Sequence, residues 1–423
     1  MFFLWNRGLR AYFFSHEKNK RGSKIRPFMD PGNSEKKGIL KEGKAILRTS
    51  PSGKEKGPGK RDGVFYNPAM VINRDISVLM IEEMVNSGLF PKRKKLRILD
   101  GMSGTGIRAL RMEREVRWEG LDVEIVANDR DPKTIENASE NTELNDSSVL
   151  LTNQDLTTLL AHERYDYIDI DPFGSPVNFI DPAVRSILNG GIISVTATDT
   201  AALTGSIPRV ALRRYGAHLF KTYFMHEVSA RVLMGYVTRV AASRDLSATP
   251  LYFYSSDHFV RGYVKMEKGA KKTDENVKNI GYLSNDEPDK PRVLNWRGVI
   301  EKKLSREILG PLWTGTLSDS RIIDGILKRI DEKEDDMDHI SNLDLIGKNM
   351  KRALREDALS PGGFDLDVIS GHTKIQQPKM DDLVSCIYQE GLSASRSRFS
   401  DKIIKTDANM ETLLRIMKEC GGN

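Results

Sequence analysis

The stretch Tyr165–Gly174, read as Tyr-Asp-Tyr-Ile-Asp-Ile-Asp-Pro-Phe-Gly, joins a buried strand to an abrupt loop. Its first six residues are aromatic, β-branched or acidic, a compact run typical of a strand inside a sheet. The strand must stop at Asp171-Pro172-Phe173-Gly174, because proline donates no ladder hydrogen bond and glycine favours a turn. In an open α/β sheet this break puts Asp171 at the carboxyl end of a strand, where such sheets bind ligands. The carboxylate, the proline carbonyl and the aromatic ring together are suited to holding the amino group of a planar base.

The preceding sequence predicts a nucleotide site. Lys95–Asp100 reads as a strand that runs into the turn Gly101–Gly106 and then into a helix from Ile107 to about Arg117. This order is that of a Rossmann-like site, although tight turns also need glycine for backbone reasons alone. A second strand, Val123–Ala127, closes before Asp129, whose carboxylate can accept both hydroxyls of a ribose.

Carboxylates recur at the ends of five successive predicted strands. The third strand is Val149–Leu151, the fourth is Tyr165–Ile170, and the fifth is Ile192–Thr198. One acidic loop means little, but repetition at a single sheet edge indicates a site. These carboxylates belong to Asp100, Asp129, Asp155, Asp171 and Asp199.

A β-hairpin is predicted after the parallel strands. Leu251–Tyr254 and Val260–Met266 flank Asp257-His258. Such a hairpin places an antiparallel strand inside or beside the sheet, which departs from the dinucleotide-binding pattern. Together with the acidic edge, it favours S-adenosylmethionine over NAD.

Methyl transfer to an exocyclic amine fits the loop at Asp171. Such an amine is a poor nucleophile, so the protein must position it. The Asp171 carboxylate and the Pro172 carbonyl could accept its two N–H bonds and direct the lone pair. Phe173 could stack on the base, a contact that contributes ~1–3 kcal/mol, and the base must leave its helix to enter the pocket.

Two other polar positions permit different interpretations. Arg74 and Asp75 lie within a predicted helix, where spacing favours an exposed pair, although the arginine could instead hold a carboxylate bidentately. His226-Glu227 lacks the second histidine of a metal-binding helix, so we interpret His226 as structural.

Composition sets broad limits. The 423 residues carry a net charge of +6 with a pI near 9.0, which permits a nucleic-acid partner without proving one. Two cysteines, Cys386 and Cys420, cannot build a four-cysteine zinc site or a disulfide framework, so we expect an intracellular chain. No apolar run approaches the ~18 residues that a membrane span requires.

The sequence predicts little regular structure in the N-terminal part of the chain and in one internal segment. We expect residues 1–41 to be a flexible basic extension, either a disordered tail or sequence upstream of a start at Met29; a transit peptide is the alternative. Residues 15–63 read as a mostly flexible arm that contains one strand. Gly269–Arg292 reads as a charged linker or long loop.

A winged-helix-like element is predicted near residues 377–407. Four apolar residues share a helical face before Gly391, a C-cap: Met380, Leu383, Val384 and Ile387. The segment Ser393–Phe399 then mixes hydroxyls and arginines that could hold RNA backbone. A plain packing domain with a basic rim is the competing interpretation.

Several motifs together resemble the tRNA guanine-26 N2-dimethyltransferase family. They are Phe65–Pro68, Asn73–Asp75, Ser103–Arg108, Asp171–Pro176, Val195–Asp199, Ala394–Ser400 and Ile404–Asp407. The resemblance runs from about Glu42 to about Asp407. It implies an α/β fold: a Rossmann-like class I methyltransferase domain over 42–268 with an antiparallel terminal hairpin, plus a tRNA-binding α+β domain over 269–423.

The activity that the resemblance implies is transfer of two methyl groups from S-adenosylmethionine to N2 of guanine 26 in tRNA. Such an enzyme belongs to the EC 2.1.1 class. We expect it to be a cytoplasmic monomer with no membrane partner.

The resemblance also implies site residues. Asp171 is the catalytic acceptor with Pro172 beside it, and Phe65 and Phe173 flank the guanine. With the glycine turn, the expected donor-binding residues are Arg74, Asp100, Ser103, Gly104, Gly106, Arg108, Asp129, Asp155 and Leu156.

Two departures from related patterns matter. Met102 stands where many methyltransferases have the first loop glycine. Many archaeal-type members have a four-cysteine zinc site, whereas the segment after Gly281–Leu283 has no cysteine, so we expect no metal.

Three rival functions stay open. An amino-methyltransferase of another RNA or of DNA could use the same loop. An NAD-dependent oxidoreductase fits the acidic strand ends and the loop less well. A catalytically silent tRNA-binding protein is disfavoured by the intact Asp171.

Overall fold

A computed structural model describes residues 38–49, 66–256, 258–284, 291–295, 298–299, 307–332 and 337–421. Phe65, which we expected to flank the base, and Asp257 of the predicted hairpin turn lie outside these ranges.

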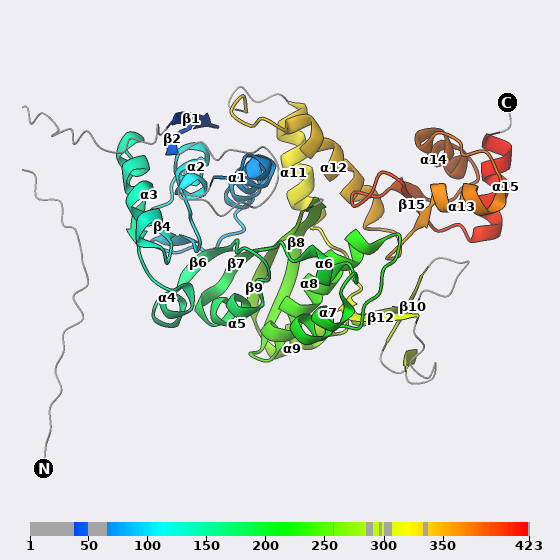
Figure 1. Cartoon of the computed structure of the whole chain (residues 1–423), viewed down its shortest axis with the longest axis horizontal. Coiled ribbons are helices and arrows are strands. Elements are labelled where there is room, and N and C mark those ends of the chain that lie inside the picture. The colour runs from blue at the N-terminus through cyan, green and yellow to red at the C-terminus, as the bar shows by residue number, and fades with distance from the viewer. Residues whose placement is uncertain are drawn as a thin grey trace, which may run out of the picture. The chain divides into compact units, whose positions relative to one another are not determined.

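A seven-stranded sheet in the order β5-β4-β3-β6-β7-β9-β8 organises the fold (Figure 1). Its first five strands are parallel, and β9 pairs antiparallel with both β7 and β8. The predicted strands and hairpin are therefore confirmed, with the antiparallel strand inside the sheet. The strands are β3 (Leu96–Asp100), β4 (Val123–Asn128), β5 (Leu150–Thr152), β6 (Tyr165–Ile170), β7 (Ile187–Ala197), β8 (Leu246–Ser256) and β9 (Phe259–Lys268).

Helices cover both faces of this sheet. Every residue of β6 is buried, since alternate side chains enter opposite cores: Ile168 and Ile170 pack in one core and Tyr167 in the other. The helices of this part are α1 (Val71–Asn86), α2 (Ile107–Glu115), α3 (Pro132–Leu144), α4 (Leu156–His162), α5 (Val177–Ser186), α6 (Thr200–Leu203), α7 (Pro208–Tyr215) and α8 (Met225–Ala242), with a 3₁₀ turn at Pro68–Met70.

The expectation of one strand within residues 15–63 is wrong. Two antiparallel strands, β1 (Gly38–Glu42) and β2 (Ala45–Thr49), form a hairpin that begins inside the segment expected to be a flexible extension. Ala45 and Leu47 are fully buried against α2. Short strands with exposed cationic residues, here Lys41 and Arg48, resemble a flexible arm in composition, which explains the error.

The predicted linker Gly269–Arg292 is also largely structured. It contains α9 (Ala270–Val277) and β10 (Ile280–Ser284), and β10 pairs with β11 (Arg292–Leu294) and β12 (Ile308–Trp313). Leu283 and Leu312 belong to the same core as α8. Helices α11 (Ser320–Asp331) and α12 (Leu343–Glu356) pack in the same core as α1. The described elements from α9 to α12 therefore extend the cores of the central sheet.

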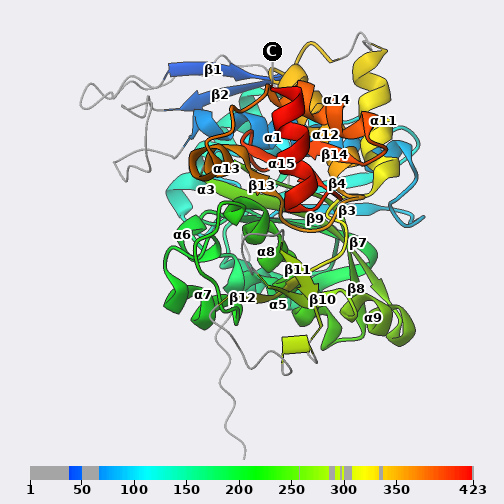
Figure 2. The ribbon, with the colours of Figure 1, turned by 90° about the vertical axis from the view of Figure 1, so that its right-hand side faces the viewer.

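A third core lies within residues 364–417. In Figure 2 the helices of this region, α13, α14 and α15, lie on the side toward the viewer. Met380, Leu383 and Ile387 are buried on α14, and Gly391 follows in the left-handed conformation with φ +75°, so the predicted helical face and cap are confirmed. The elements are β13 (Phe364–Asp365), α13 (Leu366–Thr373), α14 (Met380–Gln389), β14 (Ala394–Arg396), β15 (Ile403–Thr406) and α15 (Met410–Cys420), with sheet order β13-β15-β14.

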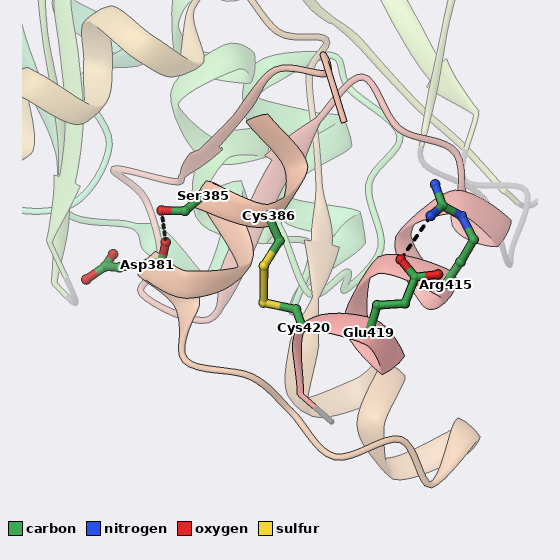
Figure 3. Close-up of a disulfide and its surroundings, with 6 residues drawn as sticks. All are labelled: Asp381, Ser385, Cys386, Arg415, Glu419 and Cys420. Atoms are coloured by element: carbon green, nitrogen blue, oxygen red, sulfur yellow. Dashed lines mark hydrogen bonds and ion pairs between the residues drawn. A yellow bond between two sulfur atoms is a disulfide. The ribbon is translucent and has the colours of Figure 1, made fainter. Parts of the chain in front are cut away.

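A disulfide joins Cys386 of α14 to Cys420 of α15 across 34 residues, beside the exposed pair Arg415–Glu419 (Figure 3). The cysteine count excluded a disulfide framework, but it did not exclude this single bond. The cysteine content therefore no longer supports the expectation of an intracellular chain. Among the described residues, no helix is both long enough and apolar enough to cross a membrane.

Candidate active site

The five predicted carboxylates follow parallel strands and therefore share one edge of the sheet. Asp100 ends β3, while Asp129 and Asp171 directly follow β4 and β6. Asp155 caps α4 after β5, and Asp199 precedes α6 after β7. The edge expected from the sequence is thus confirmed as a structural feature.

Asp171 is held by Arg108 of α2. The arginine donates through Nη2 to Oδ2 of Asp171, whose side chain remains 16% exposed. Nη1 of Arg108 donates to Oδ1 of Asn73 and to Oγ of Ser77, each at 2.8 Å. Arg108 was expected to contact the methyl donor; in the structure it orients the predicted catalytic carboxylate.

Asp169 and Arg261 lie behind this pair and were missed by sequence reasoning. Arg261 of β9 is fully buried and forms an ion pair with Asp169 at 2.5 Å. Nε of Arg108 lies 3.6 Å from Oδ1 of the same carboxylate. Burial alone would raise the pKa of Asp169, but Arg108 and Arg261 hold that pKa below its ordinary value. Charges therefore alternate from the sheet interior to its edge in the order Arg261, Asp169, Arg108, Asp171.

The sequence contained a signal for this series of alternating charges. Arg261 interrupts the apolar first part of β9, Phe259–Val264, and a buried arginine needs an anionic partner. The partner could not be identified without the strand order, because 92 residues separate Arg261 from Asp169.

The turn after β3 and helix α1 carry buried polar atoms whose hydrogen-bonding capacity is unused. In the described part of the chain, Oδ2 of Asp100, Oγ of Ser103 and Nδ2 of Asn73 have no hydrogen-bond partner. Burial raises the pKa of Asp100 to about 7, with Asp169 and Asp171 adding to the effect and Arg108 opposing it. Buried polar atoms without partners are rare in folded proteins, and this cluster has hydrogen-bonding capacity suited to a polar ligand.

The glycine turn is shaped by close backbone contacts. Gly104 and Gly106 adopt positive φ angles of +55° and +79°. The backbone N–H of Gly104 donates to Oδ2 of Asp129 at 3.1 Å, and burial raises the pKa of this carboxyl. Leu156 is buried beneath the turn: a Cβ added at Gly101 would lie 3.0 Å from its side chain. The turn and the carboxylate after β4 therefore form one unit.

Arg74 and Asp75 are buried, so the expectation of an exposed pair is wrong. Nε and Nη2 of Arg74 donate to the two oxygens of Glu42 at 2.6 Å each, and Asp75 forms an ion pair with Arg111 at 2.8 Å. The alternative of an arginine gripping a carboxylate is the one observed, although the carboxylate belongs to the chain itself. The N-terminal hairpin supplies Glu42, which sequence reasoning missed as a partner.

The remaining predicted residues differ in exposure. Pro172 is buried, whereas Phe173 is 74% exposed. Asp155 is exposed and accepts hydrogen bonds from the backbone N–H groups of Thr157 and Thr158. Away from the site, Glu227 is buried between Arg231 and Lys405.

Comparisons with known proteins give one consistent result. The sequence pattern of a family described as N2,N2-dimethylguanosine tRNA methyltransferase matches residues 45–418. A tRNA (guanine(26)-N(2))-dimethyltransferase of Methanocaldococcus jannaschii is 33% identical over 390 residues, covering 90% of this chain and 99% of that protein. The enzyme of the same name from Pyrococcus furiosus is 32% identical, covering 84% and 93% of the two chains.

A solved structure agrees with these sequence relatives. It is the complex of Trm1 from Pyrococcus horikoshii with S-adenosyl-L-methionine. The two folds superpose with a TM-score of 0.75 at 29% identity, over 89% of this chain and 99% of that one.

Proposed function

We propose, because this chain belongs to the N2,N2-dimethylguanosine tRNA methyltransferase family, that Asp171 is the group through which it methylates N2 of guanine 26 in tRNA. The chain is an S-adenosylmethionine-dependent methyltransferase with an α/β class I fold.

The observation that supports this role for Asp171 is that its two carboxylate oxygens differ in their hydrogen bonding. Arg108 occupies Oδ2, and no described residue donates to Oδ1. Oδ1 is therefore available to accept an N–H bond from the guanine amino group, while the arginine fixes the plane of the carboxylate. After the nitrogen forms its new bond to carbon, the same oxygen is placed to accept the proton that the amine must lose. The carbonyl of Pro172 supplies the second acceptor.

The residues at the glycine turn fit the donor. S-adenosylmethionine has an amino group, a carboxylate and two ribose hydroxyls, and it supplies an electrophilic methyl group when bound. Unpartnered buried atoms of Asp100 and Ser103 are suited to its polar groups, and Asp129 is suited to its ribose. Asp155 and Leu156 would border its base.

Phe173 is placed to receive the guanine. A large aromatic ring that is 74% exposed directly after Asp171 can stack on a base that has left its helix. Residues 364–417 form a compact unit of helix and small sheet that we propose contacts the tRNA. Arg398 is not available for that contact, because its side chain is buried and pairs with Glu356 and Asp357 at 2.9 Å each. We further propose that the protein acts as a cytoplasmic monomer.

Nucleoside mass spectrometry tests this function. Two tRNA transcripts, one with guanine and one with adenine at position 26, are incubated with the full chain and S-adenosylmethionine. We expect N2-methylguanosine and N2,N2-dimethylguanosine from the first transcript and no methylated base from the second. Methylation of the adenine transcript would instead favour a general amino-methyltransferase. Calorimetric binding of NADH, without binding of S-adenosylhomocysteine, would favour an oxidoreductase.

A further inference from the structure

Helix α7 abuts the loop that carries Asp171. The hydroxyl of Tyr215, its last residue, donates to Oδ1 of Asp199 at 2.7 Å and lies 2.9 Å from Oγ of Ser175. Arg214 forms an ion pair with the same aspartate at 2.9 Å. These contacts fix α7 at the carboxyl edge of the sheet, next to the proposed guanine pocket.

The outer face of α7 is basic. Arg209 and Arg213 are exposed and stand four residues apart, so they lie on one side of the helix. In the described part of the chain neither has an acidic partner. Two like charges at this spacing destabilise an isolated helix, so the pair does not stabilise the folded protein. Ile207 and Leu212, 45% and 59% exposed, extend the same surface with apolar area.

We propose that Arg209 and Arg213 bind phosphates of the tRNA strand next to the nucleotide being methylated, an inference that rests on the proposed function. Arginine pairs with phosphate through two parallel hydrogen bonds, which fixes orientation as well as distance. Phosphate contacts position a nucleic acid without reading its sequence. An everted guanine needs its backbone held on both sides of the pocket, and α7 supplies a cationic surface on a helix that contacts Ser175, two residues after Phe173.

A matched pair of variants tests this surface. Arg209→Gln/Arg213→Gln removes two charges beside the pocket, and Lys92→Gln/Lys94→Gln removes two charges just before β3, at the opposite edge of the sheet. Lys92 and Lys94 are likewise exposed and have no acidic partner among the described residues. Methylation kinetics are measured with the guanine-26 transcript, tRNA affinity is measured at several salt concentrations, and donor affinity is measured by calorimetry.

The arginine variant is expected to raise KM for tRNA roughly 10- to 30-fold near physiological salt, as loss of two phosphate contacts implies. Its plot of log affinity against log salt should be shallower by about 1.5, while kcat and donor affinity stay within about twofold of the wild type. Arg209→Lys/Arg213→Lys should restore much of the tRNA affinity, because lysine keeps the charge. The lysine-to-glutamine control should change no parameter by more than about twofold.

Two results would overturn the proposal. One is an unchanged tRNA affinity and salt slope in the arginine variant; the other is an equal loss in the control pair, which would indicate a diffuse charge effect. Because tRNA affinity is measured apart from turnover, an inactive wild type would refute the proposed function while this surface could still be tested.

Discussion

Arg108 donates a hydrogen bond through Nη2 to Oδ2 of Asp171, and this contact sets the direction in which the carboxylate faces the edge of the sheet. The arginine is itself fixed by Asn73, Ser77 and the nearby Asp169. Nearly all of its surface is buried, so it has little freedom to move. The proposed catalytic group is thus oriented by contacts that reach into the core.

The ion pair between Asp169 and Arg261 is expected to stabilise the fold. Asp169→Asn leaves Arg261 buried without its anionic partner, so the free energy of unfolding should fall by about 3–5 kcal/mol. Urea denaturation measures this difference. Asp181→Asn is the matched control, because Asp181 pairs with Arg185 and Arg244 at the exposed surface and should contribute less than about 1 kcal/mol. Equal losses in the two variants would argue against a special role for the buried pair.

Glu42 is expected to make stability depend on acid pH. Burial would raise its pKa, but the hydrogen bonds and charge of Arg74 lower the pKa from 4.5 to about 2. Its contribution is therefore complete above about pH 4.5 and is lost as the pH falls toward 2. The stability advantage of the wild type over Glu42→Gln should shrink by about 3 kcal/mol between pH 5 and pH 2. Denaturation of both proteins across this range checks it, and a constant difference would contradict the assignment.

Phe173 is expected to matter for the substrate and not for folding. Phe173→Ala should lower kcat/KM for tRNA by roughly 5- to 150-fold, which corresponds to a stacking contribution of ~1–3 kcal/mol. Because the ring is mostly exposed, the free energy of unfolding should change by less than about 0.5 kcal/mol. Steady-state kinetics and denaturation separate the two effects; a large loss of stability with intact kinetics would reverse the interpretation.

The disulfide between Cys386 and Cys420 is expected to stabilise the C-terminal core. It closes a loop of 34 residues, for which loop entropy predicts up to about 4 kcal/mol. Hydrogen exchange in α14 and α15 should therefore accelerate after treatment with dithiothreitol, while exchange in β6 stays unchanged. A Cys386→Ser/Cys420→Ser variant should show no response to the reductant. Identical exchange with and without reductant would show that the bond does not constrain this core.

The sequence was sufficient where local patterns carry the information. The run Tyr165–Ile170, the stop at Pro172 and the two runs that flank Asp257-His258 predicted the central sheet, its acidic edge and its closing hairpin. Contacts between distant residues could not be predicted in this way. The pairing of Arg261 with Asp169, or of Arg74 with Glu42, depends on which strands and helices become neighbours. The charged composition of residues 270–284 likewise led to the prediction of a linker, although part of this segment is buried.

The most direct test of the central claim is methyl transfer by Asp171→Ala, measured together with its affinities for tRNA and for S-adenosylhomocysteine. Turnover of the guanine-26 transcript should fall by at least about 100-fold, while both affinities stay within about threefold of the wild type. Turnover close to that of the wild type would contradict the account, because the guanine amino group would then not require this carboxylate.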